Sequence, residues 1–224
     1  MKSRFAMMVS MSLTVIVIIV FVILLSMTLH EAMHAFTSYW LGDDTARLQG
    51  RLTLNPLAHI DPIGTLLIPG SLIALSIISG TQLPIFGAAK PVPFNPSRVR
   101  YGEYGAALVG LAGPLTNLLF AVISGLTLRF ISVDIEIVKV ILTTFFAVNL
   151  GFFVFNMLPV PPLDGSRVLY AIAPRPLRDL MNVIEQQGLV FIFIIIFFFS
   201  NQIGALVGGV INALSQIIIG QTLF

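Results

Sequence analysis

The sequence contains no cysteine and little charge, and each scarcity excludes a class of protein. Without cysteine the chain can form neither disulfides nor thiolate metal sites, so a bound metal would need histidine, aspartate or glutamate ligands. Charged residues make up only 10% of the 224 residues, whereas soluble domains carry about a quarter. Hydrophobic residues make up 57%. This composition offers too little polar surface to face water on all sides and predicts an integral membrane protein.

The few basic residues lie mostly between the apolar runs. Of the 12 Lys and Arg residues, eight fall in the segments 42–62, 86–103 and 163–180. Basic residues spread over several loops are typical of a membrane protein with a fixed orientation, and they predict no nucleic-acid partner. The positive-inside rule predicts that these three segments are cytoplasmic. Lys2 and Arg4 favour the opposite orientation more weakly.

Long apolar runs predict an all-α polytopic membrane protein that forms a single domain over residues 1–224. Three runs are long enough to cross a bilayer as helices, and they cover residues 7–41, 104–129 and 135–158. The first run is too long for the apolar core of a signal peptide. It is therefore predicted to be a transmembrane helix that stops at Gly42.

Two further apolar regions allow more than one arrangement. Residues 63–96 end in a stretch with three prolines, which forbid a helix there. This region is predicted to cross the membrane or to re-enter it, with an extended second limb. Residues 188–220 are interrupted by Ser200-Asn201-Gln202 and predict either one kinked span or two short ones.

Three ionisable residues lie close together inside the first predicted span. The sequence His30-Glu31-Ala32-Met33-His34 has the form H-E-x-x-H. Residues four apart share one helical face, so both imidazoles can point at one ion with the glutamate beside it. An uncompensated ionisable residue near the bilayer centre costs at least a few kcal/mol. A shared ion or a water-filled pocket is therefore favoured over the alternative, in which these side chains reach the headgroups from the helix end.

Two histidines leave a catalytic zinc ion one protein ligand short. The candidates for the third ligand are His59 and the acidic residues other than Glu31. Asp164 is favoured because it follows an apolar run that ends in prolines, at a depth that can match the histidines, and Gly165 permits a tight turn after it. The alternative is that Asp164 only caps a turn. His59 and Asp61 could hold a second metal, but such a pair in a proline-flanked loop more often makes turn hydrogen bonds.

Together with H-E-x-x-H, three other motifs resemble the site-2 protease family of intramembrane zinc metalloproteases. The segment from Asn156 to Gly165 has the form N-x-x-P-x-x-P-L-D-G. Ala112-Gly-Pro-Leu-Thr-Asn117 resembles the A-G-P-x-x-N element of that family. Gly87 to Pro96 resembles the G-x-A-K-P-V-P-x-N-P stretch of its short bacterial and archaeal members. The motifs occur in the family order, and the similarity runs from about Met27 to Arg175.

The resemblance implies a zinc-dependent intramembrane endopeptidase that cleaves the transmembrane segments of other membrane proteins. It implies that one zinc ion per chain is bound by His30, His34 and Asp164, and that Glu31 is the general base for a zinc-activated water. It also implies that Asn156 faces the site, where its amide would hold the oxyanion or the peptide. Asn117 is expected to contact the substrate or to belong to the packing around the site.

The same resemblance implies a location and partners. The three core spans would carry the active site toward the cytoplasmic side of a prokaryotic cell membrane, in agreement with the charges of the loops. The expected partners are the lipid bilayer and a membrane-protein substrate with a transmembrane helix, and a PDZ or CBS domain is not expected. A substrate helix must unwind before hydrolysis, and residues 90–96, or a strand-like part of 45–54, could pair with the unwound peptide.

The main alternative function is that of a membrane metal-ion transporter or metal-binding protein. In that case His30, Glu31, His34 and Asp164 would line an ion path. Transporters usually contain internal repeats and polar residues in several spans, and the sequence shows neither. A third hypothesis, an inactive scaffold, is disfavoured by the intact Glu31.

Overall fold

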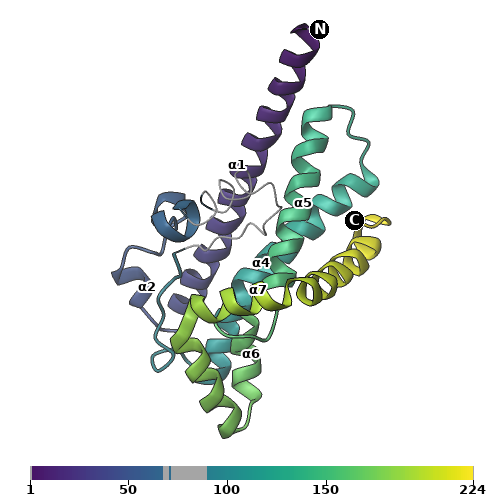
Figure 1. The fold of residues 1–224 in the computed structure, drawn as a ribbon. Coiled ribbons are helices and arrows are strands. Elements are labelled where there is room, and N and C mark those ends of the chain that lie inside the picture. Colours follow the sequence, from purple (N-terminus) through teal and green to yellow (C-terminus); the bar gives the residue numbers. More distant parts are fainter. Residues whose placement is uncertain (1, 68–70, 72–89, 224) are drawn as a thin grey trace.

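The computed structural model describes residues 2–67, 71 and 90–223, and these residues form helices and connecting loops (Figure 1). The helices, in chain order, are α1 (Lys2–Trp40), α2 (Thr45–Leu48), η1 (Pro56–Ala58), η2 (Pro62–Leu67), α4 (Glu103–Phe130), α5 (Glu136–Asn156), α6 (Gly165–Ile172) and α7 (Arg175–Ile219). Within the described ranges, four helical stretches are long and apolar enough to cross a membrane: Leu13–Trp40, Glu103–Phe130, Glu136–Asn156 and Phe198–Ile219. The prediction of an all-α polytopic membrane protein is confirmed.

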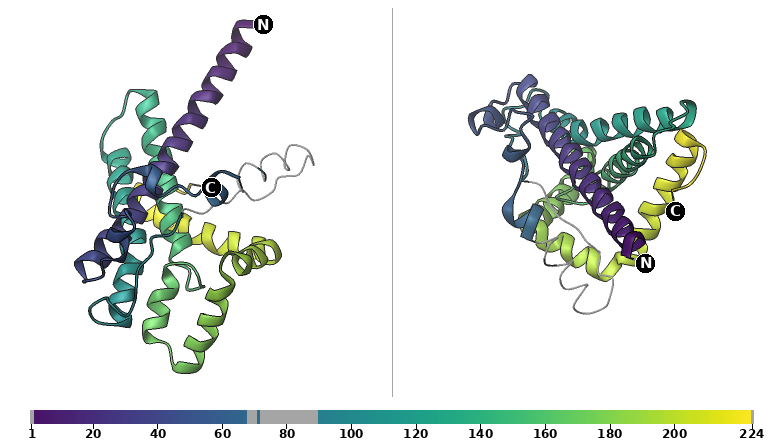
Figure 2. Two further views of the ribbon diagram at one scale, coloured as in Figure 1. Left: turned by 90° about the vertical axis from the view of Figure 1, so that its left-hand side faces the viewer. Right: turned by 90° about the horizontal axis from the view of Figure 1, so that it is seen from above.

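Helix α1 is long because no proline or glycine occurs before Gly42. It ends there because Gly42 adopts a left-handed conformation with φ +104°. Its 39 residues correspond to roughly 58 Å, about twice the thickness of the hydrocarbon core. The N-terminal part of α1 accordingly extends well beyond the other helices (Figure 2).

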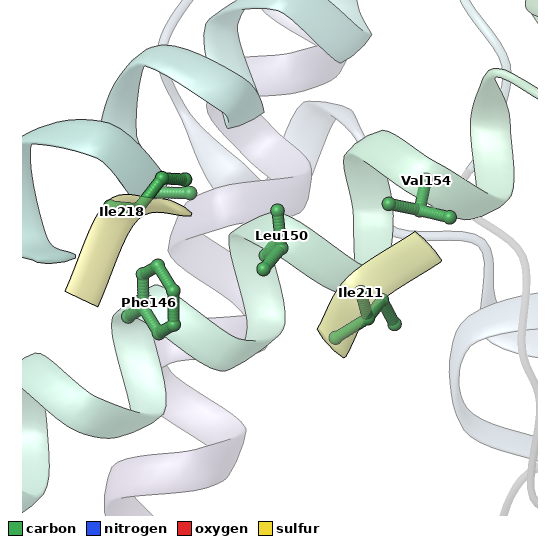
Figure 3. Close-up of a cluster of buried hydrophobic side chains, with 6 residues drawn as sticks. Phe146, Leu150, Val154, Ile211 and Ile218 are labelled. Carbon is green, nitrogen blue, oxygen red and sulfur yellow. The ribbon is translucent and has the colours of Figure 1, made fainter. Parts of the chain in front are cut away.

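Helix α4 occupies the centre of the bundle and packs against α1, α5, α6 and α7. Helices α4, α5 and α7 meet in an apolar cluster. Phe146, Leu150 and Val154 of α5 contact Ile211 and Ile218 of α7 in this cluster (Figure 3). Helix α4 also packs against α1, which carries the two predicted histidine ligands, and against α6, which begins directly after Asp164.

Residues 163–180 differ from the sequence prediction, which treated them as a polar loop. They contain α6 and the first turns of α7. No proline interrupts α6, and its small residues Ser166 and Ala171 are buried while Arg167 stays partly exposed. A few charged residues are compatible with such an amphipathic helix. A part of residues 45–54 was expected to be strand-like, and the first four of these residues form the short helix α2.

The C-terminal apolar region lies within helix α7. Helix α7 is interrupted at Gly188, with φ 50° and ψ −124°, and again at Phe199, with φ −121° and ψ 21°. Among the described residues of α7, only the stretch Phe198–Ile219 is long and apolar enough to be a candidate membrane span. For the region 63–96, the non-helical second limb is observed at residues 90–96. Whether this region crosses or re-enters the membrane depends on residues 68–70 and 72–89, which lie outside the described residues.

Candidate metal centre

The two histidines of the H-E-x-x-H motif point at the same place from one face of α1. Nε2 of His30 lies 3.0 Å from Nε2 of His34, because residues four apart on a helix are neighbours. Asp164, immediately before α6, closes the cluster. Its Oδ2 lies 3.0 Å from Nε2 of His30, and its Oδ1 lies 3.4 Å from Nε2 of His34. All three ligand atoms lie within 4.8 Å of one another, so these side chains can hold a metal ion.

Each imidazole is held through its other ring nitrogen by α4. Nδ1 of His34 lies 2.7 Å from the carbonyl oxygen of Val109, and Nδ1 of His30 lies 2.6 Å from Oδ1 of Asn117. Both partner atoms can only accept a hydrogen bond, so each Nδ1 carries the proton and donates it. Both Nε2 atoms therefore present lone pairs toward Asp164.

This arrangement of lone pairs fits a cation. Two imidazole lone pairs and a carboxylate face one another with no proton donor between them, and such acceptors repel one another unless a positive charge lies among them. Tetrahedral ligands at zinc–ligand bond lengths are about 3.3 Å apart, which is close to the observed separations of 3.0 and 3.4 Å. Two histidines and one carboxylate also form a known ligand set for catalytic zinc.

Asp164 reaches the histidines through a tight turn after α5. A Cβ atom at Gly165 would lie 2.3 Å from the carbonyl oxygen of Met157, so only glycine permits this close approach. This close approach brings the Asp164 carboxylate to both imidazoles.

Gly113 of α4 lies directly against the two imidazoles. A Cβ atom at this position would lie 2.4 Å from Nε2 of His34 and 2.7 Å from Nε2 of His30. The glycine thus leaves open the space in front of both ligand atoms. Gly113 belongs to the same Ala112–Asn117 motif that contributes Asn117, so this motif shapes the site from two positions.

Glu31 lies on α1 beside the ligands and is partly exposed. Its Oε2 accepts a hydrogen bond from the backbone N–H of Val92, at 3.1 Å. Val92 belongs to the extended segment 90–96, which the structure therefore brings to the carboxylate of the predicted general base. The ring of Phe94, in the same segment, lies under the guanidinium of Arg167, 5.6 Å from it.

Asp43 anchors the other end of the 90–96 segment. Its fully buried carboxylate accepts hydrogen bonds from the backbone N–H of Asn95, at 2.6 Å, and from the backbone N–H of Thr45, at 3.1 Å. Burial alone would raise the pKa of Asp43, but the hydrogen bond from the Thr45 hydroxyl, the two backbone hydrogen bonds and the charge of Arg98 lower it below its ordinary value of 3.8. Ionised Asp43 therefore stabilises the fold at neutral pH.

Because the pKa of Asp43 is lower in the folded state, its stabilisation is present above about pH 4 and is lost as the pH falls through the folded-state pKa. We expect Asp43→Asn to lower the free energy of unfolding by about 1–3 kcal/mol at pH 7, since one amide cannot accept all of these bonds. The variant should also lose less stability than the wild type between pH 5 and pH 3. Melting temperatures in detergent across this range measure both effects.

Asp44→Asn is the matched control for this prediction. Asp44 is the next residue and forms only a half-exposed ion pair with Arg98, at 3.0 Å. Its substitution should change the free energy of unfolding by less than about 1 kcal/mol. Equal losses in the two variants would show that Asp43 has no special role.

The two asparagines predicted near the site have different surroundings. Asn117 is fully buried and engaged with His30, which favours the packing role over contact with a substrate. Asn156 donates from Nδ2 to the carbonyl oxygen of Phe152 in its own helix, at 3.0 Å. A role for Asn156 toward the substrate stays a prediction.

His59 and Asp61 do not form a second metal cluster with a third ligand in the part of the chain that the structure describes. Nε2 of His59 lies 2.9 Å from the carbonyl oxygen of Thr53. The carboxylate of Asp61 accepts from the N–H of Gly64, at 2.7 Å. These local bonds favour the turn role that the sequence analysis preferred.

Sequence reasoning missed two polar residues that lie behind the site. Asn149 of α5 and Ser26 of α1 are fully buried. Both accept a hydrogen bond from Nδ2 of Asn117, the residue that bonds to His30: Asn149 through its side-chain oxygen and Ser26 through its backbone carbonyl oxygen. Polar residues thus do occur in more than one span, contrary to the sequence analysis. The available signal was the presence of an amide side chain inside an apolar span, since a polar residue at such a position is a functional candidate by default.

Comparison with curated proteins finds relatives whose names state a metalloprotease. The chain is 37% identical over 187 residues to "Putative zinc metalloprotease YwhC" of Bacillus subtilis, which covers 80% of this chain and 79% of that protein. It is 35% identical over 176 residues to "Putative zinc metalloprotease Rip2" of Mycobacterium tuberculosis, covering 77% of this chain and 63% of that protein. The Rip2 protein of Mycolicibacterium smegmatis is 33% identical over 147 residues, or 65% of this chain and 53% of that protein.

The chain thus spans about four fifths of the length of YwhC and less than two thirds of the length of the Rip2 proteins. No protein-family model matches the chain. No solved structure matches it either.

Proposed function

Because this chain belongs to the zinc metalloprotease family that includes YwhC and Rip2, we propose that it is a zinc-dependent intramembrane endopeptidase of the site-2 type. Its substrates are the transmembrane segments of other membrane proteins, and it carries one zinc ion per chain. The observation that carries this proposal is the convergence of His30, His34 and Asp164, as three facing acceptors, inside a bundle of membrane helices.

The depth of the cluster supports hydrolysis within the membrane. His30 lies ten residues before the end of the candidate span Leu13–Trp40, which corresponds to about 15 Å along the helix. The two imidazoles are buried, whereas the side chain of Asp164 is 23% exposed and Glu31 is partly exposed. The carboxylates therefore lie on the more open side of the site, which is the side on which we propose that water enters.

A zinc ion held by these three side chains supplies Lewis-acid chemistry, since it polarises a peptide carbonyl and lowers the pKa of water toward about 7. The Glu31 carboxylate accepts a proton from the attacking water and passes it to the departing amide nitrogen. The water oxygen first bonds to the carbonyl carbon, and the carbon–nitrogen bond then breaks as the nitrogen receives the proton from Glu31. One peptide and one water molecule thus yield a carboxylic acid and an amine.

The 90–96 segment is suited to hold the substrate beside Glu31. It is extended, it lies at hydrogen-bond distance from Glu31 through Val92, and it is anchored by Asp43 through Asn95. An unwound peptide can add to such a segment as a neighbouring strand. The prolines at positions 91, 93 and 96 lack N–H groups, so this pairing uses mainly the carbonyl groups of the segment.

The orientation follows from the basic loops. The site lies at the end of the bundle where the segments 42–62, 90–103 and 163–180 connect the helices, and these segments carry eight of the 12 basic residues. The positive-inside rule therefore supports an active site that faces the cytoplasmic side of a prokaryotic cell membrane.

Asp164→Ala tests the proposed function through both zinc and cleavage. We expect the variant to bind zinc more than about 100-fold more weakly, since even substitutions outside the ligand set cost 10- to 100-fold. It should also fail to cleave co-expressed single-span membrane proteins that the wild type cleaves within their spans. Zinc content is measured on purified protein, and cleavage sites are measured by mass spectrometry of the fragments.

Asp179→Ala, which alters an exposed carboxylate of α7, is the control and should bind and cleave as the wild type does. Unchanged zinc affinity in Asp164→Ala would remove Asp164 from the site. Zinc transport into liposomes without any cleavage would instead support the transporter alternative.

A further inference from the structure

A chain of buried hydrogen bonds runs from His30 through α4 and α5 and back to α1. Nδ1 of His30 bonds to Oδ1 of Asn117, at 2.6 Å. Nδ2 of Asn117 donates to Oδ1 of Asn149, at 2.8 Å, and Nδ2 of Asn149 donates to Oγ of Ser26, at 2.9 Å. Asn117, Asn149 and Ser26 are all fully buried. Their polar groups therefore depend on one another and not on solvent.

The direction of these bonds is set mainly at the far end of the chain, because the backbone carbonyl that Asn117 itself reaches, that of Ser26, lies 3.5 Å from its Nδ2, whereas Oδ1 of Asn149 lies at 2.8 Å. Nδ2 of Asn149 also donates to the backbone carbonyl oxygen of Phe145, at 2.8 Å. A carbonyl only accepts, so it holds the NH₂ group of Asn149 on its side and turns Oδ1 toward Asn117. Asn117 must then present its NH₂ group to Asn149 and its oxygen to His30. The proton of the imidazole is thereby held on Nδ1, and Nε2 keeps its lone pair.

His34 needs no such chain. Its Nδ1 donates directly to the backbone carbonyl oxygen of Val109, which has only one possible orientation as an acceptor. An asparagine, by contrast, can rotate its amide and exchange oxygen for NH₂. His30 is thus the ligand whose tautomer depends on residues farther away.

We propose that Asn149 and Ser26 are positioning residues for the metal centre, which orient the amide of Asn117 and so keep Nε2 of His30 available as a ligand. This inference rests on the proposed function in one respect, namely that the cluster binds zinc. Helix α5, which contributes no metal ligand, thus takes part in the site through Asn149.

Asn149→Leu is the first test, because leucine has a similar volume but neither accepts from Asn117 nor donates to Phe145. We expect zinc affinity, measured by competition with a chelator, to fall about tenfold, as for substitutions that loosen the partner of a ligating histidine. In zinc-free protein labelled with ¹⁵N-histidine, the neutral His30 ring of the wild type should carry its proton on Nδ1. The variant should show a second population with the proton on Nε2.

A rescue variant separates positioning from packing. Asn117→Asp presents an acceptor to His30 whichever way it rotates, so it makes the orienting effect of Asn149 unnecessary. The double variant Asn117→Asp/Asn149→Leu should recover zinc affinity to within about threefold of the wild type and show a single His30 tautomer. If the two residues only packed the core, the second substitution would weaken the protein further and would not restore zinc binding.

Two variants with smaller chemical changes test the inference if Asn149→Leu does not fold. Ser26→Ala removes one acceptor of Asn149 and should weaken zinc binding two- to threefold. Ser124→Ala removes an equally buried hydroxyl of α4, which donates only within its own helix, and should leave zinc binding unchanged. Equal affinities in these two variants and the wild type would overturn the inference. Failure of the wild type to bind zinc would overturn the proposed function instead.

Discussion

Glu31→Gln is expected to lower the rate of substrate cleavage by about 100- to 10,000-fold, the usual contribution of a general base. Glutamine has nearly the same shape as glutamate, and its Oε1 can still accept the N–H of Val92 that Glu31 accepts at 3.1 Å. The 90–96 segment should therefore keep its place. The only function removed is the capacity to take a proton from water, because an amide has no comparable basicity.

The same variant should bind zinc with the affinity of the wild type, since Glu31 does not belong to the ligand cluster of His30, His34 and Asp164. Cleavage in reconstituted liposomes and zinc affinity by chelator competition are the two measurements. Glu136→Gln makes the same chemical change at an exposed position at the start of α5 and should alter neither quantity. Loss of zinc from Glu31→Gln would identify this residue as a ligand, and full activity would exclude it as the base.

Gly113→Ala is expected to abolish zinc binding although it changes no ligand. The added methyl carbon would lie 2.4 Å from Nε2 of His34 and 2.7 Å from Nε2 of His30, well inside van der Waals distance. To relieve this overlap, the imidazoles or α4 must move, and either movement separates the ligand atoms. We expect a loss of zinc affinity of at least about 100-fold, with a matching loss of cleavage.

Gly151→Ala is the matched control for Gly113→Ala. Gly151 lies in the apolar helix α5, and a Cβ atom there would meet nothing within 4 Å. Alanine is favoured over glycine in helices by about 1 kcal/mol, so this variant should retain zinc binding and should be slightly more stable. If Gly113→Ala bound zinc normally, the space in front of the imidazoles would not be the metal position.

Much of the fold was readable from composition and periodicity. The long apolar runs predicted the positions of α1, α4 and α5 to within a few residues, because a helix that crosses a bilayer needs about 20 predominantly apolar residues. The helices α2 and α6 were not predicted, because neither contains such a long apolar run. They are short, they contain arginine, and their stability comes from packing against α1 and α4, which no local pattern records.

The candidate site also combines features that local sequence determines with features that helix packing determines. The spacing of four residues between His30 and His34 sets their shared helical face whatever the rest of the chain does, so their pairing was a local matter. Their approach to Asp164 joins residues 134 positions apart, and the bond from Asn149 to Ser26 joins residues 123 positions apart. Such contacts arise from the way in which three helices pack, and the sequence pattern contains no measure of that packing. Local spacing thus established which residues could share an ion, while helix packing established the third ligand's approach, the opening at Gly113 and the orientation of the His30 ring.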